Sequence, residues 1–170
     1  MRHIPNILTV LRILATPVIL NRIWVRDLDT ALVLFFLSGM TDTIDGTLAR
    51  KFNWTSKFGA IIDPIADKTL LVSAFLVLFL RDFIPFWVVA VVIGRDILIL
   101  LAAAVLKLTG WLTEFPPSVF GKISTLVQLL TAGSILLRWP ADPTPFFYAT
   151  ALLAFLSFGH YSYQIWQKLN

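Results

Sequence analysis

Residues 31–67 read ALVLFFLSGMTDTIDGTLARKFNWTSKFGAIIDPIAD. The first part of this stretch, as far as Met40, is apolar enough to lie in a membrane-spanning helix, and the polar residues that follow remain compatible with a helix as far as Arg50. Residues 51–57 form the first plausible turn, after which a second apolar run begins. Two aspartates therefore precede this turn and two follow it, and each pair adjoins an apolar run.

The spacing of the four aspartates places two of them on one face of each helix. Asp42 and Asp45 are three residues apart and Asp63 and Asp67 are four residues apart, and both separations bring side chains to the same side of a helix. Both pairs lie at similar distances from Trp54, the centre of the turn. In an antiparallel hairpin, all four carboxylates therefore converge at one depth.

Converging carboxylates repel one another, and ionisable groups at membrane depth are costly unless they are paired, hydrated or bound to metal. Because all-oxygen ligands favour hard ions, we expect two divalent cations, Mg²⁺ or Mn²⁺, an arrangement that suits phosphoryl-type displacement. Gly46 and Gly59 leave room for a nucleotide to approach the helix backbone. Arg50, one turn beyond Gly46, could clamp a diphosphate.

Two other interpretations of the aspartates are open from the residues alone. The carboxylates could be salt-bridge partners of Arg12, Arg95 and Lys122, with no metal. A divalent-cation transporter would also need carboxylates in the membrane, but it needs access from both sides, and Arg50 would repel its cation. Arg95 and Asp96 are adjacent on one helix and should not face each other, so we expect at least one of them to find a partner elsewhere.

The rest of the chain is also strongly apolar. Of its 170 residues, 58% are hydrophobic and 14% are charged, and its mean hydropathy of +0.81 places it in a bilayer. We predict an all-α polytopic membrane protein, a single domain over residues 1–170 with six transmembrane helices. The predicted helices cover residues 4–24, 30–50, 58–80, 84–106, 118–137 and 145–166, with Asp29 as the N-cap of the second. The chain contains no Cys, which excludes disulfides and thiol chemistry.

The distribution of charge indicates the partners and the orientation. The net charge is +4, but Lys and Arg lie at the ends of apolar runs, which indicates contact with anionic lipid and no nucleic acid. With six spans, both termini and the aspartates face one side. Basic residues on that side are Arg2, Arg50, Lys51, Lys57, Lys107, Lys122 and Lys168, against Arg22, Arg26, Arg81 and Arg138 on the other. This excess predicts an integral membrane protein, in the inner membrane if the cell is bacterial, with its active site facing the cytoplasm.

Residues 42–67 spell D-x2-D-G-x2-A-R-x8-G-x3-D-x3-D, with fixed residues Asp42, Asp45, Gly46, Ala49, Arg50, Gly59, Asp63 and Asp67. This pattern resembles, at every fixed position and spacing, the signature of the CDP-alcohol phosphatidyltransferase family. Such enzymes transfer a phosphatidyl group from CDP-diacylglycerol to an alcohol and release CMP. The N-terminal segment with Pro5, Asn6, Thr9 and Arg12 is also similar to that of the family.

The resemblance implies a role for each matched position. Asp42 and Asp63 would bridge the two divalent cations, Asp45 would complete the first site, and Asp67 would bind the second. Asp67 would also be the general base that deprotonates the acceptor hydroxyl. The CDP-diacylglycerol contacts implied by the resemblance are Asn6, Thr9, Gly46, Arg50, Ser56 and Gly59. Family members are typically homodimers.

The acceptor is less defined by this resemblance than the donor. Residues 94–98, 116–128 and 161–163 look more like eukaryotic-type cardiolipin synthases, whose acceptor is phosphatidylglycerol, than like phosphatidylglycerophosphate synthases, whose acceptor is glycerol 3-phosphate. The fourth helix also lacks a second arginine that the latter tend to carry. We therefore expect cardiolipin as the product. Either acceptor is anionic and needs cationic groups outside the signature, for which Arg95 and Lys122 are candidates.

Overall fold

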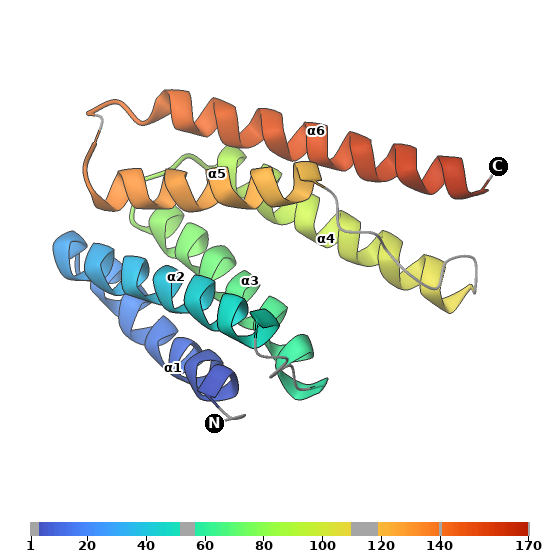
Figure 1. Ribbon diagram of the computed structural model, residues 1–170. Coiled ribbons are helices and arrows are strands. Elements are labelled where there is room, and N and C mark those ends of the chain that lie inside the picture. The colour runs from blue at the N-terminus through green and yellow to red at the C-terminus, as the bar shows by residue number, and fades with distance from the viewer. Residues whose placement is uncertain (1–3, 52–56, 110–118, 140, 170) are drawn as a thin grey trace. The chain divides into compact units, whose positions relative to one another are not determined.

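The computed structural model describes residues 4–51, 57–109, 119–139 and 141–169, without the side chains of residues 4–9, 42–51, 57–67, 103, 106–107 and 168–169. Over these ranges the chain consists of six α-helices and contains no strand (Figure 1). The helices are α1 (Ile4–Trp24), α2 (Leu28–Lys51), α3 (Lys57–Leu80), α4 (Phe86–Leu108), α5 (Val119–Leu136) and α6 (Thr144–Leu169). The predicted all-helical architecture is confirmed, and the described residues divide into two compact units.

The odd-numbered helices end in the same way, without the glycine that usually ends a helix. Arg26, Asp82 and Arg138 have φ angles of 62°, 63° and 57°, in the left-handed region. After α1, the backbone N–H of Arg26 bonds to the carbonyl of Ile23 at 3.0 Å, and that of Asp27 bonds to the carbonyl of Arg22 at 2.9 Å. These two bonds form a Schellman motif, which satisfies carbonyl groups that would otherwise lack partners at the helix end.

The N-cap of α2 is Asp27, and the prediction of Asp29 is wrong. The backbone N–H of Thr30 donates to Oδ1 of Asp27 at 3.3 Å, which is the capping bond. Hydrogen bonding by Thr30, through its side chain first and its backbone second, lowers the pKa of Asp27, and Arg22 adds to this effect. The turn after α1 is tighter than the sequence pattern suggested, so α2 begins at Leu28 and Asp29 falls in its first turn.

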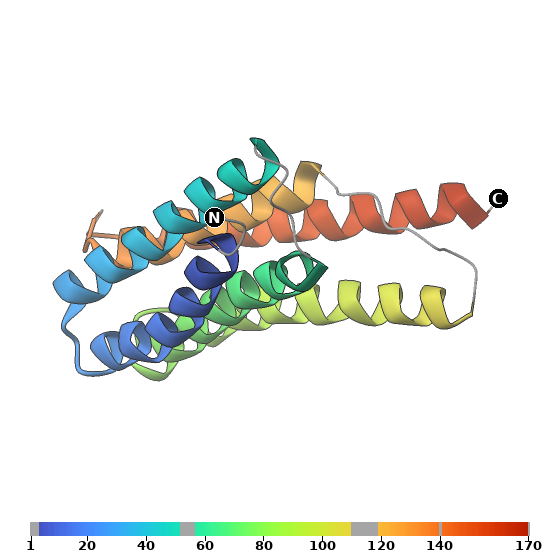
Figure 2. The ribbon, with the colours of Figure 1, turned by 60° about the horizontal axis from the view of Figure 1, so that its bottom comes forward.

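The first unit contains α1, α2, α3 and Ile135–Arg138 at the end of α5. Helix α1 packs against both α2 and α3 (Figures 1 and 2). The buried residues of this unit recur at helical spacing on each of the three helices, so one face of each helix packs against the others. They include Ile19 and Ile23 on α1, Leu28, Ala31 and Phe35 on α2, and Leu71, Phe75 and Leu78 on α3.

Arginines cluster at the end of this unit where α1 and α3 finish. The guanidinium of Arg26 lies 5.4 Å from the ring centroid of Phe83 and that of Arg81 lies 5.2 Å from the ring centroid of Trp24. Nη2 of Arg26 also donates to the backbone carbonyl of Arg81 at 3.3 Å. Aromatic and basic side chains of this kind are typical of helix ends at a membrane interface.

The second unit contains α4, most of α5, and α6. Helices α4 and α6 pack together and run in the same direction, because residues 90–94 of α4 face residues 154–158 of α6 and residues 98–105 face residues 158–165. Helix α5 bonds to α6 through the hydroxyls of Thr131 and Thr150, which are 2.7 Å apart. A multi-span topology requires alternate helices to cross the bilayer in the same direction, and the parallel arrangement of α4 and α6 agrees with this.

Large apolar side chains are exposed on the outer surfaces of both units, among them Phe36, Leu100 and Phe155. Exposure on this scale is unusual for a protein surrounded by water. Among the described residues, Val119–Leu136 is one helix that is long and apolar enough to cross a membrane, and Leu28–Thr41 and Lys68–Leu80 are shorter apolar stretches. Six transmembrane spans and one domain over the whole chain therefore stay predictions.

Candidate active site

The aspartates of the signature lie on two consecutive helices of the first unit. Asp42 and Asp45 belong to the last turns of α2, and Asp63 and Asp67 to the first turns of α3. Because α2 leads into α3 after a short loop and both pack on α1, the two aspartate-bearing ends lie at the same end of the unit (Figure 2). Their side chains lie outside the described part of the structure, so the convergence of the carboxylates stays a prediction.

The predicted donor contacts come from all three helices of this unit. Asn6 and Thr9 are in the first two turns of α1, which begins at the end of the unit that carries the aspartates. Gly46 and Arg50 are on α2 and Gly59 is on α3, while Ser56 lies outside the described residues. For Asn6, Thr9, Gly46, Arg50 and Gly59 the structure gives the backbone positions alone.

Arg12 is a buried cation on α1. It is 3% exposed, and its backbone carbonyl accepts a hydrogen bond from Oγ1 of Thr16 at 2.9 Å. In the interpretation without metal, Arg12, Arg95 and Lys122 neutralise the aspartates. However, Arg95 is paired with Asp96 and Lys122 is exposed. Arg12 belongs to the same unit as the aspartates, so the choice between salt bridges and metal stays a prediction.

The donor set suits a hard divalent ion. Among residues whose side chains are described, no group of three or more His, Asp or Glu could hold a metal. The four aspartates were predicted to form such a group, and they lie outside that search. Aspartate oxygens are the ligands that Mg²⁺ and Mn²⁺ prefer, and the chain has no Cys that would favour a softer metal.

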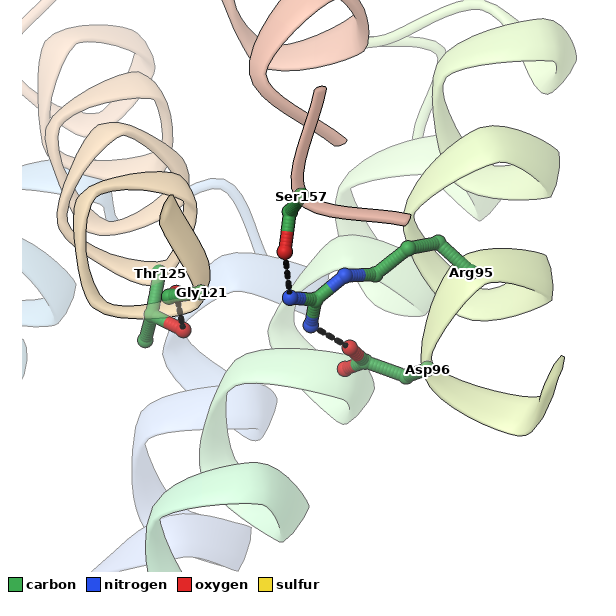
Figure 3. A network of polar contacts seen from close by, with 5 residues as sticks. All are labelled: Arg95, Asp96, Gly121, Thr125 and Ser157. Atoms are coloured by element: carbon green, nitrogen blue, oxygen red, sulfur yellow. Dashed lines mark hydrogen bonds and ion pairs between the residues drawn. The ribbon is translucent and has the colours of Figure 1, made fainter. Parts of the chain in front are cut away.

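Arg95 and Asp96 form a buried ion pair in the second unit (Figure 3). Arg95 is 8% exposed and Asp96 is 7% exposed, and Nη1 of the arginine lies 2.6 Å from Oδ1 of the aspartate. Nη2 donates to the hydroxyl of Ser157, a fully buried residue of α6. The expectation that at least one of the two finds a partner elsewhere is confirmed by the bond to Ser157. The premise that the neighbours do not face each other is wrong, because the long arginine side chain reaches back to the adjacent carboxylate.

The start of α5 packs tightly against this ion pair. A Cβ atom on Gly121 would lie 3.3 Å from Oη of Tyr161 and 3.4 Å from Nη2 of Arg95, so only glycine leaves the present spacing undisturbed. The backbone carbonyl of Gly121 accepts a hydrogen bond from Oγ1 of Thr125 at 3.1 Å (Figure 3). The next residue, Lys122, is exposed. The structure therefore brings the backbone beside Lys122 close to Arg95.

Several polar residues of this unit were not predicted as part of a site. Ser124, Gln128 and Thr131 of α5 are fully buried, and both side-chain polar atoms of Gln128 lack a hydrogen-bond partner in the part of the chain that the structure describes. Their spacing of i, i+4 and i+7 puts them on one helix face, a signal that the sequence contains. Ser157 and Tyr161, by contrast, lie beside Arg95 and Gly121 because α4, α5 and α6 pack together, and the sequence alone does not show this packing.

Comparison with known proteins identifies the family. The family model described as CDP-alcohol phosphatidyltransferase matches residues 2–161, so this chain belongs to the CDP-alcohol phosphatidyltransferase family. The family is membrane-embedded and generally uses divalent cations. Membership favours phosphatidyl transfer over the cation-transporter interpretation of the aspartates.

The chain is similar to relatives with two different names. It is 32% identical to a cardiolipin synthase (CMP-forming) / mitochondrial hydrolase fusion protein of Schizosaccharomyces pombe, over 93% of this chain and 30% of that protein. It is 34% identical to a probable cardiolipin synthase (CMP-forming) of Drosophila melanogaster, over 76% of this chain and 45% of that protein. A CDP-diacylglycerol–glycerol-3-phosphate 3-phosphatidyltransferase of Wigglesworthia glossinidia brevipalpis is 31% identical, over 98% and 97% respectively. The chain thus spans less than half the length of the first two relatives.

Proposed function

We propose that this protein transfers the phosphatidyl group of CDP-diacylglycerol to a hydroxyl of phosphatidylglycerol, giving cardiolipin and CMP. The observation that carries the proposal is the complete eight-residue signature on the adjoining ends of α2 and α3. Names of the relatives support phosphatidyl transfer in phospholipid synthesis. The resemblance of residues 94–98, 116–128 and 161–163 to cardiolipin synthases supports phosphatidylglycerol as the acceptor.

Two divalent cations, Mg²⁺ or Mn²⁺, complete the proposed site. Asp42 and Asp63 would hold both ions, Asp45 would complete the first site and Asp67 would complete the second. When bound, the ions neutralise the diphosphate of the donor and stabilise the negative charge on CMP as it leaves. A set of four carboxylates has the charge and hardness to retain them.

Asp67 is the proposed general base. Its carboxylate accepts the proton of the acceptor hydroxyl, and the resulting oxygen attacks the β-phosphorus of CDP-diacylglycerol while the bond from that phosphorus to CMP breaks. Six residues are the proposed contacts of the donor. Asn6 and Thr9 contact the diphosphate, and Gly59 contacts the cytidine. The CDP moiety is also contacted by Gly46, Arg50 and Ser56. The two glycines allow close approach of the nucleotide to the helices.

Arg95 and Lys122 are the proposed acceptor contacts. Arg95 uses two of its five N–H groups in the contacts with Asp96 and Ser157, and its buried Nε has no partner among the described residues. Lys122 is exposed at the start of α5, next to the glycine that packs on Arg95. Arg95 offers hydrogen-bond donors beyond its pair with Asp96, and Lys122 supplies the positive charge that a phosphodiester acceptor requires.

The second candidate function is phosphatidylglycerophosphate synthesis with glycerol 3-phosphate as the acceptor. It is favoured by the near-complete coverage of the Wigglesworthia relative, which is named for that reaction. Purified enzyme with labelled CDP-diacylglycerol and each acceptor in turn separates the two. We expect labelled cardiolipin with phosphatidylglycerol and little phosphatidylglycerophosphate with glycerol 3-phosphate, and the reverse product pattern would leave phosphatidyl transfer intact but reject cardiolipin synthesis.

We also propose that the active site faces the cytoplasm and that the protein acts as a homodimer in the bilayer. The orientation rests on the excess of Lys and Arg at the end that carries the aspartates. The homodimer rests on resemblance to the family.

A further inference from the structure

A groove runs along the second unit between the parallel helices α4 and α6. Two adjoining cavities form it, with volumes of about 330 Å³ and about 450 Å³, and both are lined by Leu98 and Phe158. It extends from Ala90 to Val105 on α4, which corresponds to about 22 Å at a rise of about 1.5 Å per residue. This length exceeds the depth of one bilayer leaflet, which is about 15 Å.

The lining is almost entirely apolar, with Val91, Leu101 and Phe155 among the residues that face the space. Among the residues whose side chains the structure describes, Arg95 is the one charged residue that lines either cavity. Its guanidinium is buried, and Nε lacks a partner among the described residues, so the arginine retains donors for an anion. Asp96 neutralises the charge of this arginine, and what the guanidinium offers an anion is its remaining N–H donors. An apolar groove with such donors in its wall is chemically complementary to a phospholipid, since the acyl chain fills the groove and the phosphate accepts hydrogen bonds from the arginine.

We propose that this groove binds an acyl chain of the phosphatidylglycerol acceptor, with the phosphodiester of the same lipid near Arg95. The inference rests on the proposed function and adds to it where the acceptor lipid is held. Apart from Ser56, which lies outside the described residues, the predicted donor contacts lie on α1, α2 and α3, so the groove in α4 and α6 serves a second lipid. A water-soluble acceptor would make no use of it.

Gly94 offers a way to fill the groove. It lines the smaller cavity, and a Cβ atom built on it meets nothing within 4 Å, so Gly94→Leu narrows the groove without a clash with the backbone. Leu98→Trp narrows the groove where the two cavities adjoin, and it replaces Gly94→Leu in the experiment if Gly94→Leu does not fold. The matched control is Gly159→Leu, because Gly159 also faces open space on α6 and lines neither cavity.

The experiment measures kcat/KM for dioleoyl and for dihexanoyl phosphatidylglycerol with each purified variant. We expect Gly94→Leu and Leu98→Trp to lower the ratio of long-chain to short-chain kcat/KM by about tenfold, the affinity that two buried methylenes contribute. Gly159→Leu should leave this ratio unchanged. Folding is checked by circular dichroism and by the elution volume in detergent.

If the ratio of long-chain to short-chain kcat/KM is unchanged in both groove variants while wild type still makes cardiolipin, the acyl-chain site is rejected and the proposed function stands. Wild-type enzyme that makes phosphatidylglycerophosphate and no cardiolipin would overturn both. As an independent readout, phosphatidylglycerol with a photoreactive acyl chain should label peptides that contain residues 90–105 or 154–165. Labelling confined to other peptides would reject the groove.

Discussion

Arg95 illustrates how single residues determine what this chain can bind. A cation that is 8% exposed in an apolar bundle requires a counter-charge, and Asp96 provides it at 2.6 Å. The ion pair leaves part of the guanidinium unused, so a structural role and a role in acceptor binding are compatible. The exposed Lys122 has no such structural contact with the described residues, so the two residues can be compared.

Replacing Lys122 and Arg95 should therefore have different consequences. Lys122→Ala should raise the KM for the acceptor several-fold, leave the KM for CDP-diacylglycerol nearly unchanged, and leave thermal stability unchanged because the side chain is exposed. Arg95→Ala should weaken acceptor use in the same way and also lower the free energy of unfolding by about 3–5 kcal/mol, because it breaks a buried pair. Steady-state kinetics with each substrate varied, together with thermal unfolding in detergent, tests both. Equal changes in the KM of donor and acceptor would contradict the assignment.

Asp67 is predicted to act on the acceptor, whereas Asp42 and Asp63 hold the ions that bind the donor. Asp67→Asn should lower kcat by about 10²–10⁴-fold, which is the usual contribution of a general base, while CDP-diacylglycerol binding stays close to that of wild type. Asp42→Asn and Asp63→Asn should weaken binding and catalysis together. Equilibrium binding of the labelled donor beside turnover separates these cases, and substantial activity in Asp67→Asn would remove the general-base role.

At the scale of elements, apolar runs and their polar ends were sufficient to predict six helices. The predicted first helix has the same bounds as α1, and other ends differ by up to three residues. The start of α2 was misplaced because Arg26 adopts a left-handed conformation, which shortens the turn and makes Asp27 the cap. Positions of the aspartates on α2 and α3 followed from spacing within a helix. The contacts of Arg95 with Ser157 and Gly121 depend on packing between helices and could not be predicted.

The capping role of Asp27 predicts a pH-dependent contribution to stability. Because its pKa in the folded protein is lowered, Asp27 stabilises the fold fully above the ordinary aspartate pKa of about 3.9, and this stabilisation is lost as the pH falls through the lower folded value. Asp27→Ala should lower the Tm at pH 7, and the difference from wild type should shrink in acid. Asp27→Asn retains a capping oxygen and is the control, since its Tm difference from Asp27→Ala should not depend on pH. A constant difference between wild type and Asp27→Ala down to pH 2 would contradict the role.

At the scale of the whole molecule, chemistry is assigned unevenly to the two units. The signature and the predicted donor contacts belong to the first unit. The ion pair, the buried polar face of α5 and the apolar groove belong to the second unit.

The central claim is that four aspartates hold two divalent cations for phosphatidyl transfer, and the release of CMP from labelled CDP-diacylglycerol tests it most directly. We predict that excess chelator abolishes CMP release, that Mg²⁺ or Mn²⁺ restores it, and that Ca²⁺ restores it poorly because its longer and more flexible coordination misplaces the diphosphate. The carboxylates would repel both one another and the donor without the ions. Undiminished CMP release in excess chelator would contradict the account.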